Sequence, residues 1–467
     1  MKTQLVVIGA GPAGYPAAFH AADLGMDVIL IDKDKHPGGV CLYRGCIPSK
    51  ALLHAANIMV AAREAEAIGI TFQEPTVDMD KLRQWKCSVV DKLTGGLGQL
   101  TKARGITFIQ GTARFNDARS ITVTKPDGDT HVVNFEHAVI ATGSVPVMPG
   151  FLPKSPRIID STGALALDDI PKTMLVMGGG YIGLELGQAY ASLGTRVSVV
   201  EMQASLLSGV DADMVRVLSD RVKEQFEAVM LNTRLTSLTD EGDTVKAEFE
   251  KADGKPFSAS YDKVLVAVGR RPVTDGLGLE KTNVKLTSEG FIEVDDRRRT
   301  AEPTILAVGD IAGQPLLAHK ATHEGRSAIE ALRDGKTIYD PRAIPAVVFT
   351  DPEIAWCGVT EDEARRQGMD VKIGTFPWQA SGRAATLDRS QGVTKIIADA
   401  KDERVLGVGV AGHGAGELIG EGVLAIEMGA VAEDVALSIH AHPSLSETIM
   451  EAAEQVMGQS THFFQRL

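Results

Sequence analysis

Cys41 and Cys46 are the residues of this chain whose types and spacing best suit chemistry. A metal site is disfavoured, because the nearest histidines, His36 and His54, do not stand at ligand spacing from the pair. Two interpretations stay open: two inert buried thiols, or a redox-active disulfide. Five residues of regular helix rise about 7.5 Å, whereas bridged cysteines have Cα atoms about 4.4–6.8 Å apart. A bridge therefore predicts an irregular helix start, which Gly45 favours.

A second candidate lies near the C-terminus, where His442 precedes Glu447 by five residues. On spacing alone, a hydrogen-bonded surface pair is the simpler interpretation. The functional alternative is a general base, because a carboxylate that fixes the orientation and tautomer of an imidazole suits it to remove a thiol proton. Thiolate is the attacking species in disulfide exchange, so such a base would serve the cysteines. Sequence spacing does not place His442 beside Cys41.

The elements that must position these groups begin with a glycine-rich turn. An apolar run at 5–8 enters the turn, a helical pattern follows over 13–24, and a second apolar run at 28–31 ends at Asp32. The glycines of the turn are Gly9, Gly11 and Gly14. This order predicts a dinucleotide site, in which the glycines let a pyrophosphate approach the helix N-terminus and the acid binds a ribose hydroxyl.

The same arrangement recurs later in the chain. An apolar run at 174–177 enters the turn, and a second run at 197–200 ends at Glu201. The glycines of this second turn are Gly178, Gly180 and Gly183. In both copies the acid lies 18 residues after the third glycine, from 14 to 32 and from 183 to 201. Two copies with equal spacing predict two dinucleotide sites.

Three later apolar runs, at 139–143, 264–269 and 305–310, each enter a glycine turn, as buried parallel strands do. After about residue 346 the pattern changes to short strand-like runs with turns, followed by helical stretches at 414–428 and 445–457. This change predicts a separate α+β domain at the C-terminus.

Composition narrows the function classes. The 467 residues carry 48 Lys+Arg against 61 Asp+Glu, and this net charge of −13 argues against nucleic-acid binding. Four cysteines are too few for a disulfide-stapled secreted scaffold, and no apolar stretch approaches the length of a membrane span. The cytoplasm is therefore the expected compartment. The dense basic run at 297–299 is expected to form a solvated surface turn.

Taken together, the motifs resemble the FAD-dependent pyridine nucleotide–disulfide oxidoreductases, most of all the branch that oxidises dihydrolipoamide. The matching segments are 38–54, 178–185, 308–310, 318–320, 349–353 and 440–447. The resemblance covers essentially the whole chain. It implies an α/β fold with two Rossmann-like dinucleotide-binding domains, for FAD and NAD, plus an α+β C-terminal dimerisation domain. The implied ranges are 1–146 and 274–345 for the two parts of the FAD domain, 147–273 for the NAD domain and 346–467 for the dimerisation domain.

The resemblance also implies the role of each matching residue. The implied contacts to tightly but non-covalently bound FAD are Gly9, Gly11, Gly14, Asp32, Lys33, Gly39, Lys50, Ala113, Gly143, Asp310 and Ala318. The implied contacts to NAD are Gly178, Gly180, Gly183, Glu201, Leu235, Ala267, Gly269 and Arg270. The implied catalytic residues are Cys41, Cys46, Lys50, Glu185, His442 and Glu447, and no metal is implied.

A reaction cycle is implied by the same resemblance. His442, oriented by Glu447, takes a thiol proton from dihydrolipoamide, and the thiolate attacks Cys41. Closure of lipoamide leaves the cysteines reduced, and Cys46 passes the electron pair to FAD and on to NAD. In the family the histidine comes from the opposite subunit, which implies a homodimer. The implied partners are lipoyl-bearing E2 subunits of 2-oxo acid dehydrogenase complexes, with the H protein of glycine cleavage as a second candidate.

Two residues depart from the family pattern, and the same architecture also occurs in enzymes with other substrates. Tyr43 stands where the family usually has Asn, and Asp32 where it often has Glu. Glutathione and mercuric reductases share the architecture but use NADP, whose 2′-phosphate the carboxylate of Glu201 would repel. A purely structural or binding role is disfavoured because both cysteines, Lys50 and the His–Glu pair are all present.

Overall fold

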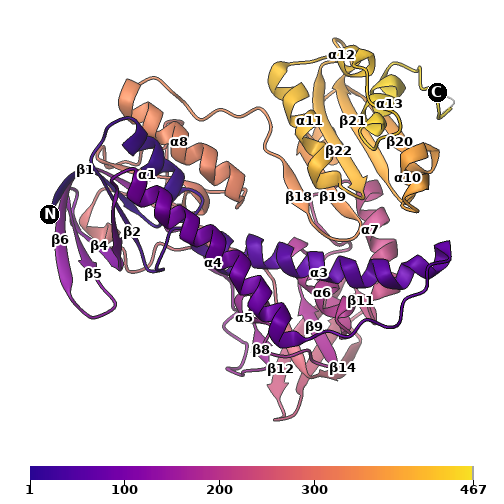
Figure 1. The fold of residues 1–467 in the computed structure, drawn as a ribbon, viewed down its shortest axis with the longest axis horizontal. Coiled ribbons are helices and arrows are strands. Elements are labelled where there is room, and N and C mark those ends of the chain that lie inside the picture. Colours follow the sequence, from indigo (N-terminus) through magenta and orange to yellow (C-terminus); the bar gives the residue numbers. More distant parts are fainter. Residues whose placement is uncertain (465–467) are drawn as a thin grey trace.

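The computed structural model describes residues 1–464, which form two sheets of the dinucleotide-binding type and a separate C-terminal sheet (Figure 1). The first sheet has seven strands in the order β3-β2-β1-β6-β5-β4, with β17 paired to β6. Its strands are β1 (Lys2–Ile8), β2 (Val28–Asp32), β3 (Thr107–Gln110), β4 (Thr112–Asp117), β5 (Ser120–Thr124), β6 (Thr130–Ile140) and β17 (Ile305–Ala307). β1, β2, β3, β6 and β17 pair in parallel, whereas β4 and β5 pair antiparallel.

Helices α1 (Gly14–Asp23) and α8 (Ala318–Asp334) pack against each other beside this sheet, although they are far apart in sequence (Figure 1). Strand β1 is apolar from Leu5 to Ile8 and β2 from Val28 to Ile31, because these parts of the parallel strands are covered on both faces. The chain between β2 and β3 forms α2 (Gly39–Arg44), α3 (Cys46–Glu64), the 3₁₀ turn Ala65–Ile68 and α4 (Met79–Ala103). Since α3 also packs on α6 (Tyr181–Ser192) of the second unit, the helix that begins at Cys46 joins the two dinucleotide units.

The second unit is built on five parallel strands in the order β11-β10-β9-β15-β8. The strands are β8 (Ile158–Ile159), β9 (Thr173–Met177), β10 (Arg196–Val200), β11 (Ala228–Met230) and β15 (Lys263–Val266). The helices are α5 (Ser161–Ala166), α6 (Tyr181–Ser192) and α7 (Ala212–Gln225). An antiparallel sheet of β12 (Thr233–Asp240), β13 (Val245–Lys251) and β14 (Pro256–Tyr261) packs beside it, and β7 (Ser144–Pro146) pairs with β16 (Arg270–Pro272).

The C-terminal unit has an antiparallel sheet in the order β18-β19-β22-β21-β20. Its strands are β18 (Ala346–Val348), β19 (Glu353–Gly358), β20 (Val371–Pro377), β21 (Val393–Asp399) and β22 (Val405–Gly412). Its helices are α9 (Glu361–Gln367), α10 (Gly382–Thr386), α11 (Ala415–Met428), α12 (Ala432–Leu437) and α13 (Glu447–Val456). Helices α11 and α13 pack on the sheet and bury its middle strands (Figure 1).

The predicted fold class is confirmed: two α/β units of the dinucleotide-binding type are followed by an α+β unit. Helix ends differ slightly from the sequence prediction, since the helix expected from residue 445 begins at Glu447. The domain boundaries stay a prediction. Across residues 1–464, no helix has the length and apolar character needed to cross a membrane.

The expectation of a solvated turn at 297–299 is wrong, because all three arginines are half-buried. Arg297 lies in a turn and Arg299 in a β-bridge with Leu306, whereas the Arg298 guanidinium reaches inward to Glu324, at 3.0 Å between Nη1 and Oε1. The side chain of Glu324 is 0% exposed, and a buried carboxylate is stable only beside cations and hydrogen-bond donors. Arg298 is therefore drawn into the structure by a charge that the local sequence does not reveal.

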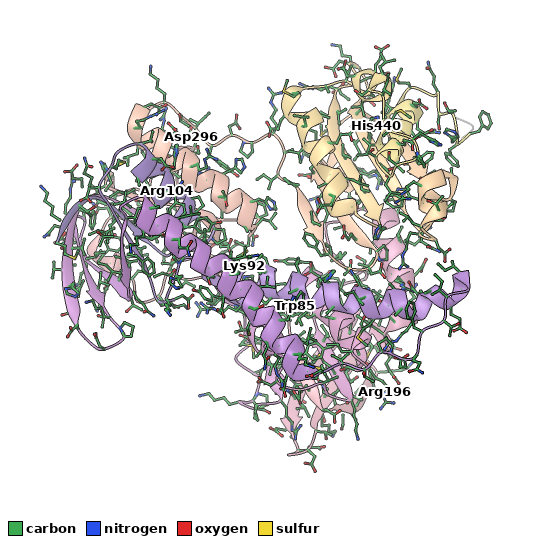
Figure 2. All side chains as sticks on the ribbon, viewed as in Figure 1. Trp85, Lys92, Arg104, Arg196, Asp296 and His440 are labelled. Atoms are coloured by element: carbon green, nitrogen blue, oxygen red, sulfur yellow. The ribbon has the colours of Figure 1, made fainter. Side chains whose placement is uncertain are left out.

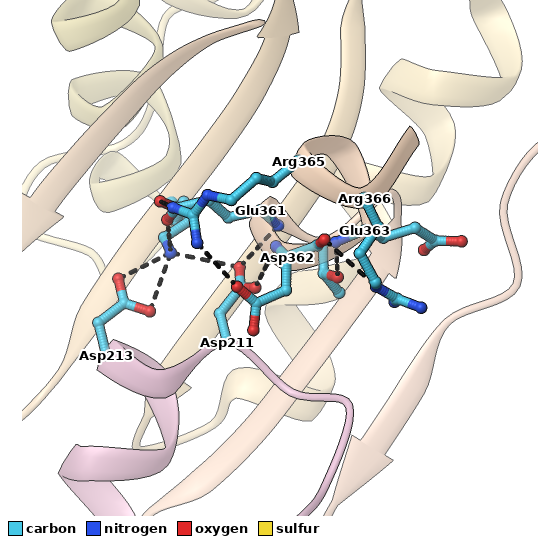
Figure 3. Close-up of polar contacts among 9 residues, drawn as sticks. Asp211, Asp213, Glu361, Asp362, Glu363, Arg365 and Arg366 are labelled. Atoms are coloured by element: carbon cyan, nitrogen blue, oxygen red, sulfur yellow. Dashed lines mark hydrogen bonds and ion pairs between the residues drawn. The ribbon is translucent and has the colours of Figure 1, made fainter. Parts of the chain in front are cut away.

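Lys395 forms the centre of a charged cluster between the second unit and the C-terminal unit. Its side chain is 2% exposed, and its Nζ lies 3.2 Å from Asp211, 2.8 Å from Asp213 and 3.0 Å from Glu361. Figure 3 shows Asp211 and Asp213 on one ribbon facing Glu361 on another. Burial acts to lower the pKa of Lys395, but Asp213, with Glu361 and Asp211, outweighs burial and raises that pKa.

We expect Lys395→Met to lower the free energy of unfolding by about 3 kcal/mol, because it leaves the buried Asp211 carboxylate without its cation. Because the pKa of Lys395 is raised in the folded state, the contribution of Lys395 to the free energy of unfolding is complete below the unfolded pKa of about 10.4. This contribution is lost as the pH rises through the folded pKa. Urea unfolding at neutral and alkaline pH measures both effects. The control is Lys372→Met, which breaks an exposed pair with Glu403 and should cost less than about 1 kcal/mol. Equal losses in the two variants would contradict the prediction.

Candidate active site

A cavity of about 600 Å³ joins the first glycine turn to the cysteine pair and to the first turn of α6. Of the residues expected to contact FAD, those that line this cavity are Gly9, Gly11, Asp32, Lys33, Gly39, Lys50, Ala113, Gly143, Asp310 and Ala318. Gly14 lies just behind the turn, where a Cβ would fall 1.8 Å from the Gly9 oxygen. The cavity thus brings together residues 8–13, near the N-terminus, and residues 308–321, which lie about 300 positions later in the chain.

The first glycine turn is shaped for a phosphate group. Gly9 has φ +97°, and a Cβ there would lie 2.3 Å from the Ala141 oxygen, so only glycine fits. Asp32 accepts hydrogen bonds from Ala10 N at 2.5 Å and Asp34 N at 2.9 Å. Burial raises the pKa of Asp32, against the effect of these hydrogen bonds. A glycine cradle ending in a carboxylate fits the ADP part of FAD.

A second group of polar residues meets at the other side of the cavity. Asp310 accepts a hydrogen bond from Ser144 Oγ at 2.5 Å, and Arg270 donates to the same hydroxyl oxygen at 2.8 Å. Tyr181, on the first turn of α6, also lines the cavity, and burial raises the pKa of its hydroxyl to about 12. Sequence analysis did not single out Ser144 or Tyr181, because a serine after Gly143 and a tyrosine after Gly180 carry no signal without the fold.

Glu324 supports the turn that carries Asp310. Its Oε2 accepts a hydrogen bond from Gly309 N at 2.7 Å, and its Oε1 contacts Arg298 at 3.0 Å and Lys320 at 3.3 Å. Sequence analysis missed this role. The only available signal was the i, i+4 spacing of Lys320 and Glu324, which is common on exposed helices as well.

The cysteine segment has the irregular geometry that a bridge requires. Helix α2 ends at Arg44, Gly45 leaves helical geometry at φ −145° and ψ −114°, and α3 begins at Cys46. A Cβ at position 45 would lie 2.9 Å from the Val40 oxygen. The predicted irregular helix start is therefore confirmed.

The two thiols are free in this structure, and each shifts the pKa of the other. The hydrogen bond from Cys41 lowers the pKa of Cys46 to about 7; burial opposes this shift, and the positive charge of Lys50 adds to it. The same hydrogen bond, together with burial, raises the pKa of Cys41. A lowered pKa makes the Cys46 thiolate a good leaving group in disulfide exchange.

The ion pair expected between Lys50 and Glu185 is present, with Nζ and Oε2 at 2.7 Å. Glu185 is almost fully buried, and it also accepts hydrogen bonds from Ser49 Oγ at 3.1 Å and Phe349 N at 3.0 Å. These three contacts come from two distant parts of the chain, because α3 and the start of the C-terminal unit both meet α6 here. The pair fixes a positive charge beside Cys46.

The second glycine turn repeats the first at the carboxyl ends of β9, β10 and β15. Gly178 has φ +109°, and a Cβ there would lie 2.5 Å from the Ala267 oxygen. Glu201 accepts hydrogen bonds from Gly179 N at 2.7 Å and Gln203 N at 2.8 Å. Of the other residues expected there, Gly180 ends the turn, Gly183 lies in the first turn of α6 and Gly269 follows β15, whereas Arg270 begins β16 and lines the first cavity.

Leu235 is the exception among the residues expected to bind NAD. Its side chain is packed in the hydrophobic core with Val200 and Phe249. Alternating residues of β12 face the core, and Leu235 falls on that face. The structure therefore does not bring this side chain to the glycine turn.

The histidine pair is formed, but it lies away from the cysteines. His442 Nδ1 is 2.9 Å from Glu447 Oε1, and Glu447 Oε2 accepts a hydrogen bond from Ser444 N at 2.7 Å. Burial acts to raise the pKa of Glu447, but the hydrogen bonds from Ser444 and His442 outweigh it and lower that pKa. The His442 side chain is 74% exposed and does not line the cavity. It belongs to the C-terminal unit, where Figure 2 labels the nearby His440.

Comparison with known proteins agrees with this geometry. The family model "Pyridine nucleotide-disulphide oxidoreductase" matches residues 3–325, and that of the "Pyridine nucleotide-disulphide oxidoreductase, dimerisation domain" matches 344–453. Dihydrolipoyl dehydrogenase of Vibrio parahaemolyticus is 46% identical, with 99% of this chain and 97% of the relative covered. The enzyme of the same name from Geobacillus stearothermophilus is 44% identical, with 99% and 98% covered.

Solved structures show the same likeness. The crystal structure of LpdA from Mycobacterium tuberculosis matches with a TM-score of 0.90 at 29% identity and covers 97% of this chain and 100% of that one. The flavoprotein disulfide reductase RclA from Escherichia coli matches with a TM-score of 0.87 at 29% identity, with 97% and 99% covered. Because the two family models together match most of the chain and full-length relatives reach 46% identity, this chain belongs to the pyridine nucleotide–disulphide oxidoreductase family.

Proposed function

We propose that this protein is a dihydrolipoyl dehydrogenase, which oxidises protein-bound dihydrolipoamide to lipoamide and reduces NAD⁺. The observation that carries the proposal is the cavity that joins the first glycine turn to both cysteines and to the Lys50–Glu185 pair. Full-length similarity to enzymes of that name supports it.

The family uses FAD and NAD, which together supply hydride transfer when bound. In our proposal, Asp32 and the first glycine turn hold the ADP part of FAD, and Asp310 holds its other end. The Ser144–Arg270 contact keeps Asp310 in place. Glu201 and the second glycine turn hold the adenosine half of NAD.

The protein's own chemistry is disulfide exchange. A thiolate of dihydrolipoamide attacks Cys41, the Cys41–Cys46 bond breaks, and Cys46 leaves as a thiolate. The second lipoyl thiolate then displaces Cys41, so lipoamide closes and both cysteines are reduced. The low pKa of Cys46 favours its departure, because a thiolate of lower pKa leaves faster.

The proton steps require a base near Cys41, and we propose that His442 of the second subunit supplies it. The dimerisation-domain match supports a homodimer. Glu447 would hold the Nδ1 side of the imidazole, as it does in this structure, and leave Nε2 for the lipoyl thiol. We further propose that the enzyme works in the cytoplasm on E2 subunits of 2-oxo acid dehydrogenase complexes or on the H protein of glycine cleavage.

The test is an assay of NAD⁺ reduction by dihydrolipoamide beside an assay of glutathione reduction by NADPH. Turnover in the first assay alone is the expected result. Turnover in the second alone would keep the fold and the disulfide but overturn the substrate and the role of Glu201. No turnover in either assay, with flavin bound, would contradict the proposed function.

We expect Glu201→Ala to narrow the preference for NAD over NADP by about tenfold or more, because the variant loses the ribose contact and the repulsion of a 2′-phosphate. The ratio of kcat/KM for the two cofactors measures the effect. Glu227→Ala, on the same unit but in an exposed pair with Arg196, is the control and should leave the ratio unchanged. An unchanged ratio in Glu201→Ala would mean that selectivity resides elsewhere.

A further inference from the structure

Tyr43 and Arg44 lie between the two cysteines, on the last turn of α2, and the exchange chemistry gives them no role. Tyr43 Oη donates a hydrogen bond to His36 O and accepts one from His36 N, both at 3.2 Å. The Arg44 guanidinium forms a bidentate ion pair with Asp34, from Nη1 to Oδ1 at 3.2 Å and from Nη2 to Oδ2 at 2.5 Å. Both side chains thus tie the redox segment to residues 34–36, which we call the anchor loop.

The anchor loop is itself held on both sides. Asp34 N donates to Asp32 Oδ1 at 2.9 Å, and downstream Gly38 N donates to Ala10 O at 2.8 Å. At Gly39 a Cβ would lie 2.4 Å from the Gly11 Cα, so the backbone packs directly on the first glycine turn. The loop therefore offers the redox segment a fixed support.

The redox segment needs such support. Helix α2 has six residues, too few to be stable alone, and Gly45 interrupts the helical hydrogen bonds before α3. Without side-chain ties, Cys41 would move relative to Cys46, which sits at the start of the long helix α3. The two ties hold the segment between the cysteines where the chain next to Cys46 packs on Cys41, since a Cβ at Gly45 would lie 3.2 Å from the Cys41 Cα.

We propose that Tyr43 and Arg44 are positioning residues that hold Cys41 against Cys46 and thereby stabilise the disulfide relative to the dithiol. The inference rests on the proposed use of this pair as a redox disulfide. Oxidation joins the two sulfur atoms and releases two protons and two electrons to the acceptor. Closing this ring costs less conformational entropy when the thiols are already held together, so the ties favour the bridge.

The test is a redox titration of the holoenzyme in buffers of reduced and oxidised dithiothreitol, followed by acid quench, alkylation and mass-spectrometric counting of free Cys41 and Cys46. In each titration the protein disulfide takes two electrons and two protons from dithiothreitol, which closes to its own disulfide. For Tyr43→Phe and for Arg44→Gln we expect the equilibrium constant for reduction of the disulfide to rise about three- to tenfold. This change corresponds to the net free energy of about one hydrogen bond. Tenfold corresponds to about 30 mV for a two-electron couple.

The matched control is Arg104→Gln. Arg104 also pairs with an aspartate, Asp23, at nearly the same side-chain exposure as Arg44 (29% against 27%). It lies at the end of α4, where Figure 2 labels it, and neither it nor Asp23 lines the cavity that holds the cysteines. In Arg104→Gln, the redox midpoint of the Cys41–Cys46 pair should stay at the wild-type value. If Arg44→Gln loses FAD, Tyr43→Phe, which keeps the ring, decides the question. The double variant Asp34→Asn with Arg44→Gln should match Arg44→Gln alone, since both break one tie.

Wild-type midpoints in Tyr43→Phe and in a folded Arg44→Gln would overturn the proposal. An equal shift in Arg104→Gln would overturn it as well, since the effect would then be general destabilisation. Neither dihydrolipoamide nor NAD enters this titration. A protein that fails the dihydrolipoamide assay but shows the midpoint shift would therefore refute the substrate and keep the positioning role.

Discussion

Replacing Cys46 by serine is expected to abolish NAD⁺ reduction by dihydrolipoamide while the protein keeps its FAD. Without Cys46 no bridge forms, so the attack on Cys41 has no disulfide to open and no thiolate to release. When catalytic residues act as one unit, replacing one of them removes nearly the whole rate enhancement that they give together. We therefore expect kcat to fall by several orders of magnitude. The purified variant should remain yellow, because serine is close in size to cysteine and the glycine turns are untouched.

The control for this experiment is Cys87→Ser. Cys87 is an exposed thiol on α4 that does not line the cavity, so its loss should leave turnover unchanged. Flavin absorbance and dihydrolipoamide turnover, measured on the same preparations, separate loss of chemistry from loss of cofactor. Normal turnover in Cys46→Ser would refute the assignment of the redox pair.

The local parts of this site could be predicted from sequence because each depends on residues close in the chain. The glycine turns require positive φ at Gly9 and Gly178, and only glycine meets that need at both places. The acids follow at fixed distance because a helix and a strand of set length separate them from the turn. The break at Gly45 follows from the short spacing of the two cysteines.

The parts that escaped prediction depend on contacts between distant segments. Glu324 supports the Asp310 turn only because α8 packs on the 3₁₀ turn Gly309–Ala312, and the 297–299 run then supplies Arg298 to the same carboxylate. The core position of Leu235 depends on the side of β12 that faces the sheet. Lys395 and its three carboxylates come from two units that no local pattern connects.

His442→Gln is expected to lower kcat by about 10²–10⁴, the usual contribution of a general base. Fold and FAD content should persist, because the His442 side chain is exposed and outside the cavity. Within one chain the base lies apart from Cys41, so the site must be completed by a second copy if His442 acts as proposed. A drop in rate alone does not show which subunit supplies the base.

Mixed dimers answer that question. A purified heterodimer of one Cys46→Ser chain and one His442→Gln chain retains one intact site if the base crosses between subunits, and should show about half of the wild-type activity. If His442 served its own chain, both sites would be defective and activity would be near zero. The reciprocal heterodimer, wild type with a chain carrying both changes, reverses the outcome: no activity for a shared site and about half for a self-contained one. Because the two heterodimers contain the same substitutions in different arrangement, a difference between them reports only where the histidine acts.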